Sequence, residues 1–225
     1  MLDWVEALVG RRGSCLDLGC GTGAVSERLL ARFPAARSVG VDFDPVLLRL
    51  GATGLGDVRG RMNWVDADLR TSGWVRALPR KRYDAALSST ALHWLSGVQL
   101  SGLYRSLARV LRPGGVFLNA DQIAFGSSSA RLRQAARALR HRRPPTSSRP
   151  PSRHGENWAD WWTAIAREPE LRAELELRAQ RFPHEHMGTP TPDLAGQRVR
   201  LLRAGFREVE VVWSSGESRV LAAVR

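Results

Sequence analysis

The sequence predicts an α/β fold with a mostly parallel sheet, and three observations support this. Short apolar runs alternate with segments of helical period through the first half of the chain, as in successive βαβ units. The first apolar run ends in a glycine-rich turn, residues 19–23, that leads into a helix. With 225 residues, 43% of them hydrophobic, the chain is long enough for one such domain with an insertion.

The elements of the first 121 residues follow one another as strand and helix. We expect strands at residues 14–18, 38–42, 62–65, 83–88 and 116–120, and helices at residues 22–32, 45–50 and 98–111. Asp44 can cap the second of these helices, and Pro45 suits its first turn. The third helix ends before the Pro113-Gly114-Gly115 run, because proline disfavours helix before it and glycine supplies positive φ.

The regular alternation fails between residues 122 and 192, which we interpret as a helical insertion that caps the substrate. It contains a basic helix at 130–140, a proline- and serine-rich linker at 141–155 that we expect to be mobile, and two helical segments within 156–180. Residues 193–225 complete the core. They hold a helix that ends at Ala204 and a hairpin of strands at 208–213 and 219–224.

The charge and composition exclude several classes. The net charge is +12, but residues 131–155 hold eight arginines and no acid, so the basicity is a local feature. Cys15 and Cys20 lie in one segment and lack zinc spacing, which makes a disulfide framework or a metal site implausible. No run reaches the ~18 apolar residues of a membrane helix, and residues 1–6 resemble no targeting segment, so we expect a cytoplasmic protein that does not bind membranes.

The glycine turn is the strongest single feature, yet it is ambiguous alone. Gly19, Cys20, Gly21 and Gly23 fit a cofactor loop, and the same run satisfies the dinucleotide fingerprint with alanine in the last position. Asp17 is the discriminator, because a dehydrogenase strand is usually apolar at that point. Its carboxylate can order the loop through backbone N–H groups or meet an ammonium group of the cofactor.

Acidic residues after the next two strands support a nucleoside site. Asp42 ends the second strand, where it can accept hydrogen bonds from ribose hydroxyls, and Phe43 beside it can cover an adenine face. Asp68 can accept from the adenine amino group, with the backbone N–H of Leu69 donating to the ring. Asp66 is a rival for this role.

These residues together resemble the class I S-adenosylmethionine-dependent methyltransferase family from about Ser14 to Ala120 and again from Leu194. The matching runs are Leu16-Asp17-Leu18-Gly19-Cys20-Gly21-Thr22-Gly23, Val41-Asp42, Ala67-Asp68-Leu69, Tyr83-Asp84, Ala91-Leu92-His93-Trp94-Leu95, Leu111-Arg112-Pro113-Gly114-Gly115 and Ala204-Gly205-Phe206. The resemblance implies a Rossmann-like, doubly wound, seven-stranded sheet with its last strand antiparallel and the insertion between strands five and six. It also implies S-adenosyl-L-methionine as cofactor, with Ser88 as a backbone contact.

The turn after the fourth strand is where the acceptor should bind, because ligands lie beyond the carboxyl ends of such strands. His93 is the candidate base or orienting group, since imidazole can exchange a proton near neutral pH. The alternative is a histidine that only packs or caps a helix. Trp94 can wall an apolar acceptor pocket, or it can belong to the core.

The insertion supplies further candidates. Trp158, Trp161 and Trp162 share one helix face that must cover either the sheet or a substrate. His186, or His184, is a candidate substrate contact in a loop that follows the insertion helices. Two histidines without a distant third ligand make metal binding a weak hypothesis, so we expect no metal.

The leading functional hypothesis is methylation of a small-molecule acceptor. Nucleic-acid methylation is the alternative that the arginine cluster suggests, although Ser88-Ser89-Thr90-Ala91 replaces the loop that relatives use on a flipped base. A non-catalytic cofactor-binding protein is a third hypothesis, suggested by the 13 residues before Ser14 where relatives have longer helices. An NAD-dependent dehydrogenase ranks last. The acceptor, the methylated atom and the oligomeric state are not predicted.

Overall fold

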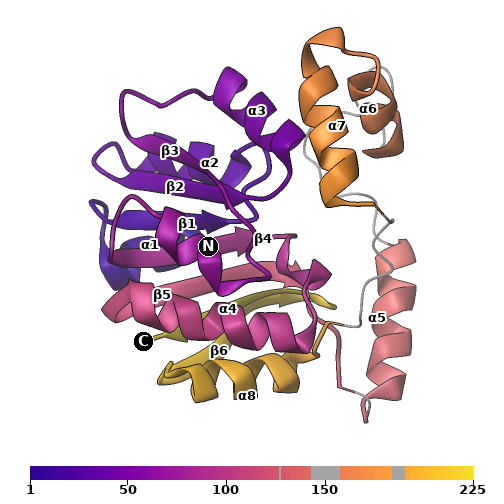
Figure 1. Cartoon of the computed structure of the whole chain (residues 1–225). Coiled ribbons are helices and arrows are strands. Elements are labelled where there is room, and N and C mark those ends of the chain that lie inside the picture. The colour runs from indigo at the N-terminus through magenta and orange to yellow at the C-terminus, as the bar shows by residue number, and fades with distance from the viewer. Residues whose placement is uncertain (127, 143–157, 184–190) are drawn as a thin grey trace.

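A seven-stranded sheet forms the centre of the protein in a computed structural model that describes residues 1–126, 128–142, 158–183 and 191–225. The strand order is β3-β2-β1-β4-β5-β7-β6, and β7 runs antiparallel to both neighbours. This confirms the expected fold class (Figure 1). The strands are β1 (Ser14–Leu18), β2 (Arg37–Asp42), β3 (Met62–Asp66), β4 (Tyr83–Ser89), β5 (Leu111–Gln122), β6 (Glu208–Ser215) and β7 (Ser218–Val224).

Helices cover both faces of the sheet. One face carries α1 (Leu2–Val9) and α2 (Ala24–Arg32), whose buried residues Val5, Leu29 and Leu30 join the core cluster beneath them. The other face carries α4 (Gly97–Val110) and α8 (Leu194–Ala204), which pack on each other. Helix α3 (Pro45–Gly54) contacts β2 and β3, so it lies near the edge of the sheet that β3 forms.

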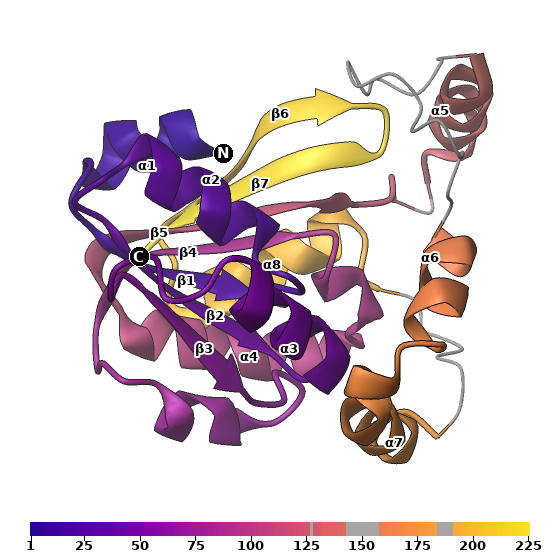
Figure 2. The same cartoon turned by 90° about the horizontal axis from the view of Figure 1, so that it is seen from above.

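The insertion lies beyond the carboxyl ends of the parallel strands (Figures 1 and 2). It contains α5 (Ala130–Arg142), α6 (Trp158–Ile165), the short 3-10 helix η3 (Pro169–Leu171) and α7 (Arg172–Arg181). Helix α7 packs against α3, and Ala136 of α5 approaches the turn between β6 and β7 at Gly216. Most of the linker expected to be mobile, residues 143–155, lies outside the described residues.

The observed elements differ most from the predicted ones in α3, η1 and β5. Helix α3 continues to Gly54, four residues beyond the expected end, and a 3-10 helix η1 (Ser72–Ala77), capped by Thr71, was not predicted. β5 begins at Leu111 rather than 116, because Leu111 pairs with Tyr83 before a register shift. No helix within the described residues is both long and apolar enough to cross a membrane.

Two glycines of α3 give a test of how tightly the helix packs. A Cβ on Gly51 would lie 2.5 Å from the Trp64 ring and 3.0 Å from the Thr22 carbonyl oxygen, whereas one on Gly54 would meet nothing within 4 Å. The Trp64 indole donates to the Gly56 carbonyl at 3.0 Å, which limits how far the ring can move.

We therefore expect Gly51→Ala to lower the free energy of unfolding by about 1–3 kcal/mol through overpacking. The matched variant Gly54→Ala should leave it unchanged or raise it by up to about 1 kcal/mol, because alanine favours helix. Urea denaturation of both variants measures the difference. Equal effects would contradict this packing of α3 on β3.

Candidate functional site

The glycine loop joins β1 to α2 and adopts a backbone that favours glycine. Gly19, Gly21 and Gly23 have φ values of +64°, +54° and +88°. The Gly19 amide donates to the Val41 carbonyl at 2.8 Å, which ties the loop to the end of β2.

The space around the three glycines differs. A Cβ on Gly19 would overlap Ala91, and one on Gly23 would lie 2.5 Å from Trp64. A Cβ on Gly21 would meet only Leu47, at 3.9 Å. The first two are needed for internal packing, so Gly21 is the position where the loop leaves open space for a ligand.

Asp17 is buried at the end of β1, with 2% exposure. Its Oδ2 accepts hydrogen bonds from the backbone N–H of Ser26 at 3.0 Å and from the Ser26 hydroxyl at 2.7 Å. Burial raises the pKa of this carboxyl to about 6, although the bonds from Ser26 oppose the shift. Asp17 thus fixes the first turn of α2, the helix after the glycine loop, rather than the loop amides themselves.

Asp42 holds the glycine loop against the end of β2. Its Oδ2 accepts from the Gly21 amide at 2.7 Å, and its Oδ1 accepts from the amides of Phe43 at 2.7 Å and Asp44 at 2.9 Å. Burial raises the pKa of Asp42, and these three N–H groups oppose that rise. The carboxylate therefore lies beside Gly21, at the point predicted for a ribose.

The two acids at the end of β3 and just after it are paired with arginines. Asp68 receives Arg70 through Nε at 2.8 Å and Nη2 at 2.8 Å, and Asp66 receives Arg181 from α7. Leu69 is buried beside them, with 9% exposure. The roles predicted for Asp68 and Leu69 toward adenine remain predictions, and any adenine amino group would share Asp68 with Arg70.

Phe43 follows Asp42 and is half-buried. The guanidinium groups of Arg181 and Arg70 lie 4.4 Å and 5.1 Å from its ring centroid, and the Phe182 ring meets it edge-on at 5.7 Å. Its predicted role as an adenine cover also remains a prediction.

Ser88 lies inside the sheet, with no exposed surface. Its hydroxyl donates to the Leu18 carbonyl at 2.8 Å, linking β4 to β1. Because this bond uses the hydroxyl proton, the Ser88 hydroxyl cannot also donate to a cofactor. The backbone contact expected for Ser88 remains a prediction.

His93 lies in a 3-10 turn, η2 (Leu92–Trp94), after β4, and is held by Asp121 at the end of β5. Its Nδ1 is 2.8 Å from Asp121 Oδ1, and its backbone N–H donates to Asp121 Oδ2 at 3.0 Å. The Thr191 hydroxyl donates to the His93 carbonyl. A proton on Nδ1 satisfies the carboxylate and leaves Nε2 as the acceptor nitrogen.

Asp121 and Thr191 were not among the predicted site residues. An acid at the end of the expected strand 116–120 is a usable signal for Asp121, because neighbouring parallel strands end at one edge of the sheet. Thr191 is distant in sequence and carries no motif, so nothing local indicated its contact.

Trp94 is exposed by 53%, so the core alternative for this residue is wrong. Its ring lies 4.9 Å from the His93 ring, between centroids. The position is compatible with the predicted acceptor wall, which remains a prediction.

The other aromatic and histidine candidates belong to the insertion. Trp158, Trp161 and Trp162 contact one another, and the first two stack at 5.1 Å. His184 and His186 lie outside the described residues.

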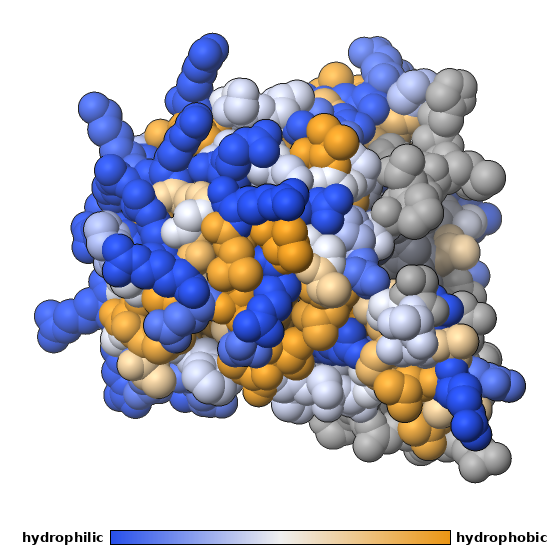
Figure 3. Space-filling view, turned by 90° about the horizontal axis from the view of Figure 1, so that it is seen from below, coloured by the Kyte–Doolittle hydropathy of each residue, from blue (hydrophilic) through white to orange (hydrophobic). Residues whose placement is uncertain are grey.

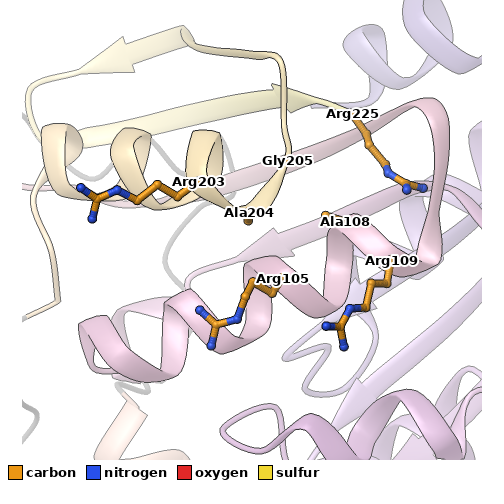
Figure 4. A pocket seen from close by; sticks show the side chains of 7 residues that line it. All are labelled: Arg105, Ala108, Arg109, Arg203, Ala204, Gly205 and Arg225. Carbon is orange, nitrogen blue, oxygen red and sulfur yellow. The ribbon is translucent and has the colours of Figure 1, made fainter.

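A separate pocket of about 300 Å³ lies between the carboxyl ends of α4 and α8 (Figure 4). Its arginines do not converge: Arg203 and Arg105 extend toward the left of the view, whereas Arg225 extends toward the right (Figure 4). Hydrophilic side chains cover much of the corresponding left end of the face seen in Figure 3. Because the pocket adjoins the amino end of β5, it is remote from the glycine loop at the carboxyl end of β1.

Comparisons with known proteins agree with this arrangement. Residues 15–115 match a family model described as a methyltransferase domain. Trans-aconitate 2-methyltransferase of Azoarcus sp. (strain BH72) is 39% identical over 101 residues, which are 45% of this chain and 36% of that protein. Malonyl-[acyl-carrier protein] O-methyltransferase 2 of Ilyobacter polytropus is 28% identical over 103 residues, 46% of this chain and 37% of that protein. The chain thus spans little more than a third of the length of these curated relatives.

Solved structures show the same fold at low sequence identity. Human N-acetylserotonin methyltransferase in complex with SAM superposes with a TM-score of 0.56 at 14% identity, over 94% of this chain and 47% of that one. An O-methyltransferase family protein from Burkholderia thailandensis gives 0.61 at 17% identity, over 100% and 55%.

The matched segment contains the glycine loop, Asp42 and His93, and it coincides with the part of the sheet where these residues meet. With the sequence motifs and the strand order, this match shows that residues 15–115 are similar to a methyltransferase domain.

Proposed function

We propose that the chain transfers a methyl group from S-adenosyl-L-methionine to a small-molecule acceptor. The observation that carries this proposal is the placement of the glycine loop with Asp42, and of His93 with Asp121, at the carboxyl ends of neighbouring strands. Ligands of such sheets bind at this edge. The relatives named for trans-aconitate support a metabolite as the acceptor, and the relative named for malonyl-[acyl-carrier protein] is compatible with a small acyl group.

The residues present fit the cofactor. The open side of Gly21 admits a ligand close to the backbone, and Asp42 retains acceptor capacity for ribose hydroxyls beyond its three N–H bonds. The cofactor supplies a methyl group already activated on a sulfonium. The protein therefore has to align the acceptor and exclude water.

His93 extends this proposal to the acceptor. With Nδ1 directed to Asp121, the Nε2 nitrogen can take a proton from an acceptor hydroxyl, while Asp121 fixes the ring and its tautomer. The His93 side chain is 32% exposed, so an acceptor can reach it, whereas that of Asp121 is 2% exposed. An acceptor that arrives protonated on oxygen is the class that uses this arrangement.

The open side of Gly21 gives a test of cofactor binding. Asparagine tolerates positive φ, so Gly21→Asn fills the space beside Asp42 with limited backbone strain. We expect wild type to bind S-adenosylhomocysteine in calorimetry, and Gly21→Asn to bind at least tenfold more weakly. Gly102→Ala on α4, where a Cβ meets only Arg105 at 4.0 Å, is the matched control and should bind as wild type. No binding by wild type at millimolar ligand would refute the cofactor assignment.

Variants of His93 and Asp121 separate the methyl-transfer step from cofactor binding. His93→Gln should lower kcat by about 10²–10⁴, the usual contribution of general acid–base catalysis, without changing the affinity for S-adenosylhomocysteine. Asp121→Asn should lower kcat by a smaller factor, because Asp121 is a positioning residue. Methyl transfer from labelled cofactor to a panel of hydroxyl and carboxyl metabolites supplies the assay. Full activity of His93→Gln toward every acceptor methylated by wild type would remove His93 from the mechanism.

The buried carboxyl of Asp17 should make stability depend on pH. Because its pKa is raised from 3.8 to about 6 in the folded protein, its contribution to stability is full below pH 3.8 and is lost as the pH rises through 6. The loss corresponds to about 3 kcal/mol. Asp17→Asn does not titrate, so its free energy of unfolding should rise relative to wild type by about that amount between pH 3.5 and 7. Parallel pH profiles in denaturant titrations would contradict the raised pKa.

A further inference from the structure

The last turn of α7 is joined to acids that follow β2 and β3. Arg178 Nε donates to Asp44 Oδ2 at 2.6 Å. Arg181 donates through both terminal nitrogens to the carboxylate of Asp66, at 2.7 and 2.8 Å, and also to the Phe43 carbonyl at 2.8 Å. The partners of these two arginines lie within two residues of Asp42 or at the end of β3, so the helix lies over the nucleoside side of the proposed site.

Ring contacts reinforce the same junction. The Arg181 guanidinium lies 4.4 Å from the Phe43 centroid, and Phe182 meets Phe43 edge-on. Arg178 lies 4.0 Å from the Trp162 centroid, which connects α6 to α7. The last turn of α7 thus contributes charge and ring contacts between the insertion and the domain, in addition to the ion pair of Glu174 with Arg49 of α3 at 3.7 Å.

Helix α7 has no buried residue of its own. Its contacts are partly solvated as well: the exposed side-chain fractions are 35% for Arg178 and 9% for its partner Asp44, and 18% for Arg181 and 47% for its partner Asp66. Ion pairs with this exposure are individually weak, and salt screens them. A helix attached in this way can detach without breaking the core of the domain.

We propose that α7 is a latch that closes the nucleoside side of the cofactor site, with Arg178 and Arg181 locking it to Asp44 and Asp66. This rests on the proposed function, because Asp42 and Phe43 are then the ribose and adenine contacts. Cofactor binds to the domain while the latch is open and is retained when it closes. The latch therefore controls the rate of cofactor release, and this rate rises with salt.

The latch also engages an acid of the nucleoside side. Asp66 is bound by Arg181 of the latch, whereas Asp68 is bound by Arg70, two residues along the chain. Any adenine amino group would therefore share Asp68 with Arg70, with the latch open or closed.

Stopped-flow release of S-adenosylhomocysteine tests the latch. Arg181→Gln should speed release about three- to tenfold, as expected for losing a partly exposed ion pair together with a ring contact. Asp66→Asn should speed it by a smaller factor, because the ring contact of Arg181 with Phe43 remains. The double variant should release no faster than Arg181→Gln alone, because that substitution already removes the ion pair with Asp66. Arg172→Gln, an exposed position on the same helix, is the matched control and should release at the wild-type rate.

Hydrogen exchange of the ligand-free protein provides a second readout. Arg178→Gln/Arg181→Gln should speed exchange of the α7 amides while leaving β1 and β4 unchanged. Unchanged release and exchange in these variants would overturn the latch while cofactor binding stands. Faster release in Arg181→Gln with wild-type release in Asp66→Asn would overturn the ion pair of Arg181 with Asp66 as the lock. Absence of binding by wild type would instead refute the proposed function.

Discussion

The carboxylate of Asp42 is the interaction on which the candidate site depends. It gathers the amides of Gly21, Phe43 and Asp44, and so fixes the glycine loop after β1 to the end of β2. Asp44, placed by this turn, then caps α3 through the amides of Val46 and Leu47. Burying such a carboxylate is costly without hydrogen bonds, and three N–H donors offset that cost while leaving acceptor capacity. The same group therefore shapes the loop and offers itself to a ligand.

Two sets of contacts divide the site. The cofactor half depends on short-range turns around Gly19–Gly23 and Asp42. The acceptor half depends on η2 after β4 meeting the end of β5, where His93 and Asp121 lie 2.8 Å apart. Helix α7 joins the first half from the distant insertion through Arg178 and Arg181. If the proposed function holds, the cofactor is selected by the sheet, whereas its retention is controlled by the insertion.

The sequence predicted local features well because each has a local cause. The strand before Gly19, the cap at Asp44 and the helix stop before Pro113 follow from glycine, aspartate and proline chemistry within a few residues. The fold class also followed, since alternating apolar and helical segments favour parallel sheets. The start of β5 at Leu111 was missed because pairing with Tyr83 on β4 extends the strand through the Pro-Gly run.

Contacts between residues distant in sequence could not be predicted. Nothing near Asp66 indicates that Arg181 will pair with it, so the roles predicted for Asp66 and Asp68 toward adenine took no account of arginine partners. Trp94 could equally have been core, because an aromatic in an apolar run does not reveal which side faces solvent. A crystal structure with S-adenosylhomocysteine tests most directly where the cofactor lies. We expect ribose hydroxyls on Asp42, the loop backbone at Gly21 against the ligand, and the sulfur directed toward His93. Ligand bound instead in the arginine-lined pocket between α4 and α8 would contradict this placement.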